Sequence, residues 1–140
     1  MKNIKIRDLK IQDNKKIEKL FIQLTSRPVN FDPKFLIKNK LSHCRIIIED
    51  SGKIIGFAAL IIHPTPTKGL VGRVEDVVID KNYREKGYGR LLMEDLIGIA
   101  KKKRIKILTL TSNSSRIPAR KLYESLGFQL LDTGIFWMNI

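Results

Sequence analysis

The sequence of 140 residues is informative first for what it contains little of, beginning with side chains that bind metals. It has one cysteine and two histidines. Cys44 can form no internal disulfide, and the apolar run around it predicts a core position rather than a nucleophile. Because these three residues are scattered along the chain, we expect no bound metal.

Long hydrophobic runs are also missing. No segment reaches the run of about 18 apolar residues that a membrane-spanning helix requires. The longest stretch, 54–62, is interrupted by Gly56 and is typical of a strand. The first residues lack the apolar core of a signal peptide. Together with the single cysteine, these absences predict a cytoplasmic protein.

Acidic residues are scarce relative to basic ones. The chain has 14 Asp and Glu against 27 Lys and Arg, which gives a formal net charge of +13. Such an excess favours either a polyanionic partner or simply a solvated, lysine-rich surface. The sequence shows no nucleic-acid-binding motif, and one Trp and three Tyr make a poor stacking platform, so nucleic-acid binding is not expected. The 43% of hydrophobic residues predict one globular domain over residues 1–140.

Hydrophobic periodicity and turn residues predict an alternation of strands and helices. One helix should begin at Asp13 or Asn14, and a second at Asp32, where Pro33 suits the first helical position. A third should follow Gly89, and a fourth should begin near Pro118. The expected strands cover 3–7, 44–49, 54–62, 72–79 and 105–110, followed by a closing hairpin of 128–131 and 135–138.

The stretch 74–90 stands out, because an apolar strand leads into a basic glycine turn and then into an amphipathic helix. Its turn reads Arg84-x-x-Gly87-x-Gly89. A helix start carries unpaired N–H groups and a partial positive charge, and glycine lets an anion approach the backbone. The pattern therefore predicts a phosphate site, and its spacing matches neither a P-loop nor a dinucleotide fold.

This turn strongly resembles the acetyl-CoA signature of the GNAT superfamily of acyl-CoA N-acyltransferases. A second segment, 119–128, is similar to the family's A-x-x-x-Y-E-x-x-G-F motif. Residues 73–89 are also similar to the cofactor half of the glucosamine-6-phosphate N-acetyltransferases and their small relatives. The resemblance implies an α/β (α+β) fold, with a single mixed, mostly antiparallel sheet, a central parallel strand pair and about four flanking helices.

The resemblance also implies the positions that contact acetyl-CoA, which would serve as co-substrate. Backbone amides of the glycine turn would hold the pyrophosphate, and the main chain of the strand before it would pair with the pantetheine arm. Asn113 corresponds most nearly to a cofactor-contacting Asn of many relatives, although Ser115 and Arg116 stand at the usual spacing. The implied contacts are Val77, Val78, Ile79, Arg84, Glu85, Lys86, Gly87, Tyr88, Gly89, Arg90 and Asn113.

Acetyl transfer to an amine needs a neutral amine, a stabilised oxyanion and a protonated leaving thiolate. By resemblance, Tyr123 is the acid that protonates the thiolate, and the amide of Val78 faces the thioester oxygen. Glu75 is the candidate base, directly or through a water. Asp76 lies beside it, and since strand alternation points neighbours to opposite faces, we expect at most one of the two to face the substrate.

The predicted function is therefore N-acetyl transfer from acetyl-CoA to a primary amine of a small molecule or peptide. A GNAT-fold module that binds acyl-CoA without catalysis is the alternative. The acceptor is left open, as is the oligomeric state, although strand 135–140 could pair across a homodimer.

Overall fold

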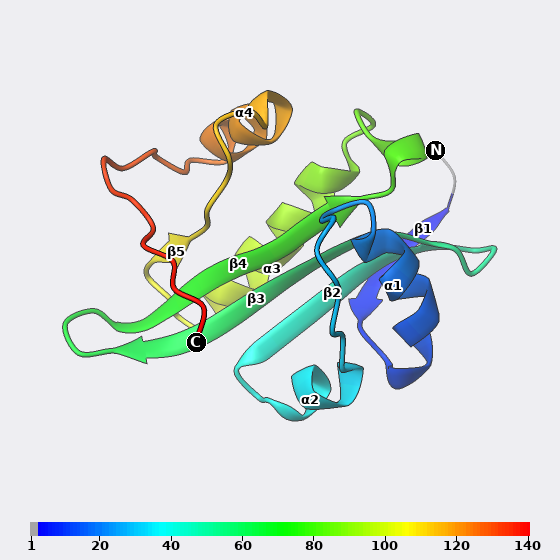
Figure 1. Cartoon of the computed structure of the whole chain (residues 1–140), viewed down its shortest axis with the longest axis horizontal. Coiled ribbons are helices and arrows are strands. Elements are labelled where there is room, and N and C mark those ends of the chain that lie inside the picture. The colour runs from blue at the N-terminus through cyan, green and yellow to red at the C-terminus, as the bar shows by residue number, and fades with distance from the viewer. Residues whose placement is uncertain (1–2) are drawn as a thin grey trace. The chain divides into compact units, whose positions relative to one another are not determined.

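A computed structural model describes residues 3–140 and divides the chain into two compact units. The first unit ends at Leu110, and the second is Thr111–Ile140. Figure 1 follows the chain from its N-terminus in blue to its C-terminus in red. Among the described residues, no helix is long and apolar enough to cross a membrane.

The first unit is built on a five-stranded sheet. Its strands follow one another in the order β1 to β5, and every neighbouring pair is antiparallel except β4 and β5, which run parallel. The mixed, mostly antiparallel sheet confirms the predicted fold class, but among the described strands the parallel pair lies at the edge of the sheet and not at its centre. The strands are β1 (Ile4–Asp8), β2 (Ser42–Glu49), β3 (Ile54–Thr65), β4 (Gly69–Ile79) and β5 (Leu108–Thr109).

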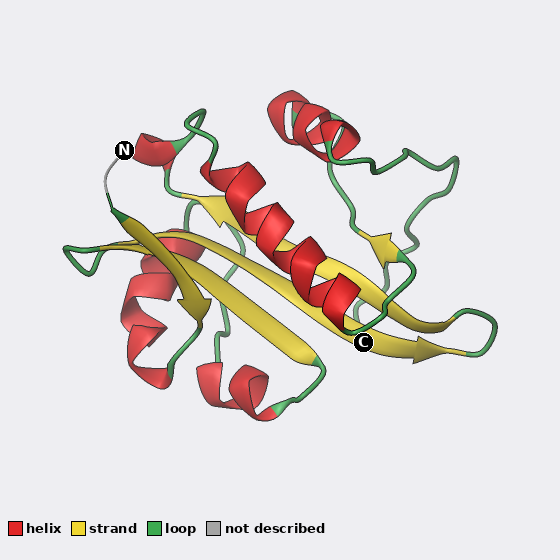
Figure 2. Ribbon diagram, turned by 180° about the vertical axis from the view of Figure 1, so that it is seen from behind, coloured by secondary structure: helices red, strands yellow, loops and turns green. Residues whose placement is uncertain are grey.

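Four α-helices and two short 3-10 turns complete the described chain. In the first unit, α1 and α2 cover one face of the sheet and α3 covers the other, as the two opposite views show (Figures 1 and 2). Helix α4 belongs to the second unit. The helices are α1 (Asn14–Phe21), α2 (Pro33–Lys38), α3 (Tyr88–Lys102) and α4 (Ile117–Ser125), and the 3-10 turns are η1 (Ile11–Asp13) and η2 (Lys81–Tyr83).

Cover on both faces explains why the central strands read as continuous apolar runs rather than as alternating patterns. Ile46 and Ile47 point to opposite faces of β2, and both are fully buried. On the α1–α2 side, Ile46 packs in one cluster with Ile17 and Phe57. Burying such side chains supplies about 1.5–3 kcal/mol each, so the sheet is the part of the unit that positions everything else.

Helix α2 begins where its sequence predicts. The Asp32 carboxylate accepts hydrogen bonds from the backbone N–H groups of Lys34 at 3.0 Å and Phe35 at 3.4 Å, and Pro33 occupies the first helical position. This cap matters for the site below, because it sets the direction in which the short helix leaves the preceding loop.

The β3–β4 hairpin is longer than expected. Residues 63–65 and 69–71 belong to strands, with His63 opposite Val71 and Pro64 opposite Leu70, rather than to an open loop. Pairing between β2 and β3 ends at Ile61, so β3 has a free edge by the time it reaches Pro64. Proline is tolerated on such an edge, because its missing N–H costs no ladder hydrogen bond.

The predicted closing hairpin is wrong, since residues 128–140 contain no strand. Leu131 and Trp137 are 69% and 73% exposed, so the segment's apolar side chains form no core of their own. An isolated two-stranded hairpin is only marginally stable without apolar packing, and alternation alone therefore overestimates strand formation here.

Gly72 is expected to be the most size-restricted glycine of the sheet. A Cβ there would lie 2.6 Å from Leu108 Cδ2 and 2.9 Å from Leu60 Cδ1. Gly72→Ala should lower the free energy of unfolding by about 1–3 kcal/mol through overpacking. Gly98→Ala is the matched control, because open space surrounds that helical position, and it should raise stability by about 1 kcal/mol. Urea unfolding measures both, and an unchanged Gly72→Ala midpoint would contradict the packing account.

Candidate functional site

Strand β4 carries one extra residue near the middle of its pairing with β3. The pair Phe57–Val78 is followed by Ala59–Glu75, so β3 advances by two positions while β4 advances by three. Asp76 lies in this interval with a φ of 53°, in the left-handed region. The feature is a β-bulge, and aspartate is among the non-glycine residues that tolerate this conformation.

The bulge changes the direction of side chains along β4. In a regular strand Glu75 and Asp76 would point to opposite faces, but both residues line the same cavity on the α1–α2 side of the sheet. The expectation that at most one of them faces the substrate region is therefore wrong. The physical reason is the extra residue, which interrupts the period-two alternation on which that expectation rests.

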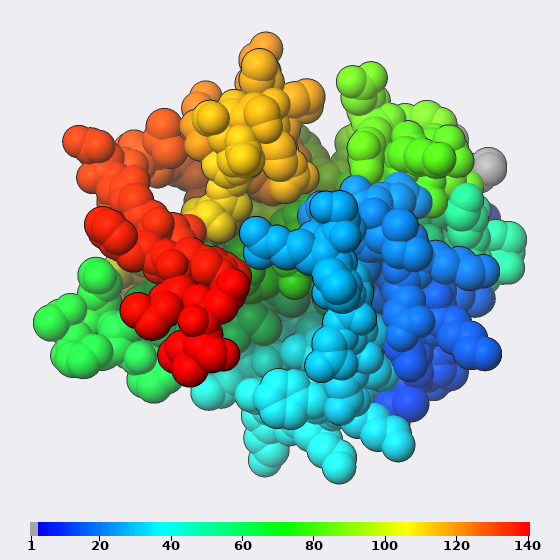
Figure 3. Space-filling model, in the orientation of Figure 1, coloured from blue at the N-terminus to red at the C-terminus, as the bar shows by residue number. Residues whose placement is uncertain are grey.

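The cavity has a volume of about 750 Å³ and lies between the segment after α1, helix α2 and the middle of β3 and β4. Figure 3 shows the light-blue segment after α1 standing over the green strands. Most of the lining is apolar, and three of the six polar or charged lining residues carry carboxylates. The lining residues are Phe21, Leu24, Thr25, Arg27, Pro28, Val29, Asn30, Phe31, Asp32, Phe35, Leu36, Phe57, Ala59, Ile61, Glu75 and Asp76.

Glu75 has a cationic neighbour on its own strand. Arg73 Nε donates a hydrogen bond to Glu75 Oε1, and the two side chains are 38% and 39% exposed. A pair this accessible to solvent contributes little to stability. Its main effect is to hold the Glu75 carboxylate beside a positive charge at the edge of the cavity.

Asp76 has no such neighbour. No hydrogen bond or ion pair joins its carboxylate to another side chain in the part of the chain that the structure describes. Burial raises the pKa of Asp76, and the negative charge of Glu75 raises it further. A carboxylate held towards a cavity without a cation is a ready partner for a positively charged ligand.

The outer edge of β4 is open over its last residues. Parallel pairing with β5 is confined to Gly72 opposite Leu108 and Arg73 opposite Thr109. In the described chain no strand continues this ladder along 77–79, where sequence reasoning expects the pantetheine contacts. Apart from the Ile79 carbonyl, which accepts from Arg84 Nε, the backbone groups on that side are therefore available to a ligand that binds as an added strand.

Gln23, in the segment after α1, is hydrogen-bonded to the end of β4. Its amide nitrogen donates to Asp80 Oδ2 at 3.2 Å, and its amide oxygen accepts from the Lys81 N–H at 2.8 Å. Asp80 is buried and also accepts from the Asn82 N–H at 2.9 Å. Burial would raise the pKa of Asp80, but the hydrogen bonds from Asn82 and Gln23, with nearby lysines, outweigh it and lower the pKa. These contacts position the turn that follows.

The glycine turn leads directly into α3. Gly87 has a φ of 86°, which favours glycine, and open space surrounds the position of a Cβ. Leu91 N–H donates to Gly87 O at 3.1 Å, which is the first hydrogen bond of the helix. The N–H groups of Tyr88, Gly89 and Arg90 precede that bond, so the helix itself supplies no acceptor for them. Such N–H groups, with the partial positive charge of the helix start, suit an anionic ligand.

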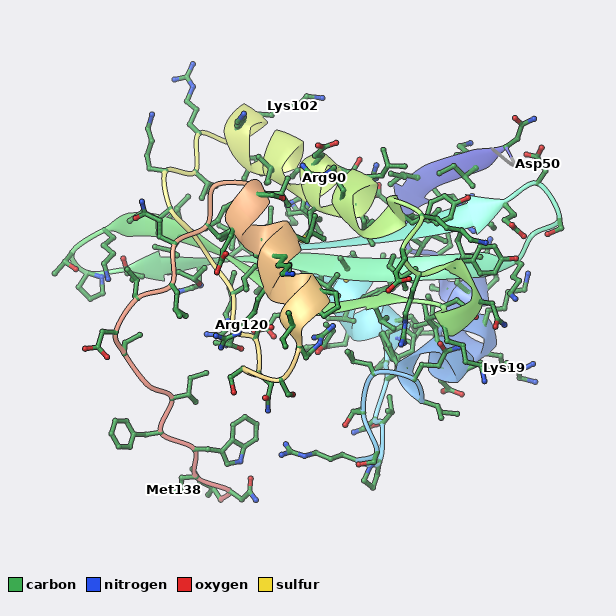
Figure 4. All side chains as sticks on the ribbon, turned by 90° about the horizontal axis from the view of Figure 1, so that it is seen from above. Lys19, Asp50, Arg90, Lys102, Arg120 and Met138 are labelled. Carbon is green, nitrogen blue, oxygen red and sulfur yellow. The ribbon has the colours of Figure 1, made fainter. Side chains whose placement is uncertain are left out.

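Basic side chains surround this turn. Arg84 Nε donates to Ile79 O at 3.0 Å, which fastens the turn to the end of β4. Lys86 Nζ lies 5.7 Å from the centre of the Tyr83 ring. Arg90 extends from the first turn of α3 (Figure 4), and its Nη1 lies 3.5 Å from Glu94 Oε1. The site therefore combines backbone donors with exposed cations, as a phosphate ligand requires.

Tyr123 belongs to the second unit and lies on α4. Its side chain is buried, and its ring meets that of Phe128 edge-on, with 6.1 Å between the centroids. Burial raises the pKa of Tyr123, although the positive charge of Arg116 opposes the rise. The phenol therefore stays protonated at neutral pH, as a proton donor must.

Asn113 shapes its own loop. Its side-chain oxygen accepts from the backbone N–H and the hydroxyl of Ser115, both at 2.9 Å. Arg120 braces the same loop by donating to the carbonyls of Ser112 and Asn113. These contacts give Asn113 a turn-forming role in the second unit, and its contact with acetyl-CoA stays a prediction.

Sequence reasoning missed the walls of the cavity. Phe31 and Phe35 belong to a segment without clear periodicity, and Arg27 precedes a proline that only marks the end of a helix. The one available signal was the Asp32-Pro33 helix start, which places a second short helix over the sheet. That signal predicts the position of a helix, but it does not predict the cavity between the helix and the sheet.

Comparison with known proteins agrees with this geometry. The family model described as acetyltransferase (GNAT) family matches residues 14–128. A glucosamine 6-phosphate N-acetyltransferase of Trypanosoma brucei brucei is 40% identical over 83 residues, which are 58% of this chain and 54% of that protein. A ribosomal protein bS18 alanine N-acetyltransferase of Escherichia coli is 40% identical over 53 residues, 38% of this chain and 36% of that protein. The matched stretches thus span about half, or less, of these relatives.

Solved structures extend the similarity over the whole chain. The structure of a Trypanosoma brucei acetyltransferase has a TM-score of 0.83 and 27% identity, covering 98% of this chain and 100% of the other. The glucosamine-6-phosphate N-acetyltransferase of Arabidopsis thaliana shares the fold, with a TM-score of 0.86, 24% identity and coverage of 98% and 99%. With the glycine turn, the open β4 edge and the family model agreeing, the chain belongs to the acetyltransferase (GNAT) family.

Proposed function

We propose that this chain is an N-acetyltransferase that moves an acetyl group directly from acetyl-CoA to a primary amine of a small molecule or peptide. The proposal rests on strand β4 and its surroundings. Strand β4 places two acidic residues in the lining of a cavity and has no neighbouring strand along 77–79 in the described chain, and it is followed by a glycine turn at the start of α3. The names of the similar trypanosomal and bacterial proteins, which are amine acetyltransferases, support the same chemistry.

The residues of the turn and strand fit acetyl-CoA. The amides of Glu85, Lys86, Gly87, Tyr88, Gly89 and Arg90, with the Arg84 side chain nearby, would hold the pyrophosphate, and the main chain of Val77, Val78 and Ile79 would pair with the pantetheine arm. The missing acceptors at the start of α3 and the open β4 edge support this assignment. Bound in this way, acetyl-CoA would supply an acetyl thioester near the amide of Val78.

Glu75 is the proposed base. An alkyl amine is protonated at neutral pH, so its proton must leave before the nitrogen can attack the thioester carbonyl carbon. Glu75 would accept that proton directly or through a water. Its place at the cavity edge, next to Arg73, supports the role.

Tyr123 is the proposed acid. As the new C–N bond forms, the carbonyl becomes an oxyanion, and the Val78 N–H would donate to it. The C–S bond then breaks, and the departing sulfur takes the phenolic proton of Tyr123. The raised pKa of Tyr123 supports this assignment, because the phenol stays protonated until a strong base appears. The nitrogen loses two protons in all. The first passes to Glu75 before attack, the second leaves to solvent as the tetrahedral intermediate collapses, and Tyr123 gives one proton to the thiolate.

The family model spans both units, which supports treating residues 1–140 as one functional domain. A cytoplasmic location is part of the proposal, supported by the free, buried thiol of Cys44.

Titration calorimetry with acetyl-CoA, followed by free-thiol detection over a panel of amines and short peptides, tests the function. We expect binding and amine-dependent thiol release. Absence of acetyl-CoA binding would contradict the proposal at its first step. Tight binding with only background thiol release would instead favour the non-catalytic acyl-CoA-binding module.

Tyr123→Phe should separate chemistry from binding. The variant keeps the ring that packs against Phe128 but removes the proton donor, so turnover should fall by about 100-fold or more. Acetyl-CoA affinity, measured by calorimetry, should change little. Unchanged turnover in the variant would remove Tyr123 from the acid role.

Gly89→Val should block acetyl-CoA binding, because a branched side chain would stand where the pyrophosphate approaches the backbone. Gly98→Val is the matched control, since it places the same side chain on the same helix in open space. Calorimetry should show loss of binding in the first variant and retention in the second. Equal affinity of two folded variants would contradict the anion site at the glycine turn.

We also propose that the active form is a homodimer that uses the C-terminal residues. This segment exposes a run of large apolar side chains, a pattern that marks interaction surfaces. The exposed residues are Ile135, Phe136, Trp137, Met138 and Ile140.

The paired substitution Phe136→Ser with Trp137→Ser should convert a dimer into a monomer. Light scattering after size-exclusion chromatography measures the mass directly. Ile22→Ser is the control, because Ile22 is 72% exposed but lies elsewhere, at the end of α1. A native protein that is monomeric at all concentrations would refute the dimer.

A further inference from the structure

The charge of the cavity is opposite to the charge of the chain. The whole sequence has a net charge of +13, yet the described cavity lining contains three carboxylates and one basic residue, Arg27. One of the carboxylates, Asp32, is already engaged by the N–H groups of α2. Glu75 and Asp76, on β4, therefore make the sheet side of the cavity negatively charged. A cavity with this charge favours a cation.

The walls above the sheet are apolar. Phe31 contacts Phe21 edge-on, with 5.2 Å between ring centroids, and Phe21 in turn contacts Phe57 at 4.9 Å. Phe35 also lines the space and is 69% exposed, so it presents a large apolar surface with no protein partner covering most of it. Such walls bind hydrocarbon, because apolar ligand surface leaves water on entering.

We propose, on the basis of the function above, that the acceptor is a small primary amine with an apolar aryl or branched-alkyl body, and that its ammonium group binds at Asp76. The body lies against Phe31 and Phe35. A cavity of about 750 Å³ is large enough for such a molecule.

Asp76 is suited to be the ammonium anchor. Its position in the bulge places Asp76 in the cavity lining, and no described side chain forms a hydrogen bond or ion pair with its carboxylate. A bound cation relieves the repulsion between Asp76 and Glu75. Glu75, which Arg73 already neutralises in part, remains the base that takes a proton from the anchored amine.

Phosphorylated amines fit this cavity poorly. A phosphate group carries close to two negative charges and binds where cationic or backbone donors converge. Among the lining residues that the structure describes, Arg27 is the only basic one, and the carboxylates on the sheet side would repel the anion. Sugars also offer many hydroxyls, for which the phenylalanine walls supply no partners.

Acetylation rates for 2-phenylethylamine and 3-methylbutylamine, compared with glucosamine and glucosamine 6-phosphate, test the inference. Free thiol is measured with acetyl-CoA saturating. We expect the apolar amines to have kcat/KM values at least 10-fold above those of the sugars. Preferential turnover of glucosamine 6-phosphate would overturn the inference while leaving the proposed function intact.

Two variant pairs locate the contacts. Asp76→Asn keeps the volume and tolerates the left-handed backbone, so it should raise the KM for 2-phenylethylamine about 10- to 100-fold and change kcat less. Asp50→Asn, at the tip of the β2–β3 turn (Figure 4), should have no effect. Phe35→Ala should raise KM several-fold, whereas Ile37→Ala, on the same helix but outside the cavity lining, should not.

Binding provides a readout that does not depend on catalysis. If no amine is acetylated, calorimetric titration of 2-phenylethylamine into the native protein with CoA present still decides the matter. Binding that Asp76→Asn weakens supports the inference even though the proposed function has failed. No binding of the apolar amine, or equal binding by Asp76→Asn, overturns it.

Discussion

The single residue inserted into β4 at Asp76 is the constraint on which the rest of the site depends. Without it, Glu75 and Asp76 would point to opposite faces, and only one could enter the cavity. With it, the strand presents an acidic pair to one face and continues to Ile79, where the glycine turn begins. One local irregularity therefore lies between an acidic cavity and a glycine turn that leaves backbone N–H groups without helical acceptors. The left-handed backbone at Asp76 is the conformational cost of that arrangement.

Positive and negative side chains gather in different places around β4. Helix α3 directs its positive end at the glycine turn, and Lys101 and Lys102 complement its negative end (Figure 4). The basic residues near the turn suit the phosphates of acetyl-CoA, while the cavity on the α1–α2 face of the sheet is acidic. The net charge of +13 therefore describes the surface and the turn but is opposite in sign to the charge of the cavity lining. Average composition is a poor guide to a single cavity.

Sequence reasoning reached the fold class, the helix starts at Asp32 and near Gly89, and the glycine turn, because each has a strong local signature. It failed where the outcome depends on partners distant in sequence. The bulge at Asp76 arises from the register of β4 against β3, and no local pattern announces it. The closing hairpin was expected from alternation alone, yet residues 128–140 contain no strand and most of their large apolar side chains are exposed. The cavity walls combine α1, α2, β3 and β4, so they exist only in the folded chain.

Amide chemical shifts of the 15N-labelled protein test most directly whether CoA binds at the glycine turn and the amine binds in the cavity. Addition of CoA should shift the amides of Tyr88, Gly89 and Arg90 and of the β4 edge at 77–79, and should leave those around Phe31 and Phe35 nearly unchanged. Subsequent addition of 2-phenylethylamine should shift the second group. CoA-induced shifts confined to the cavity walls, or absent from the glycine turn, would contradict the account.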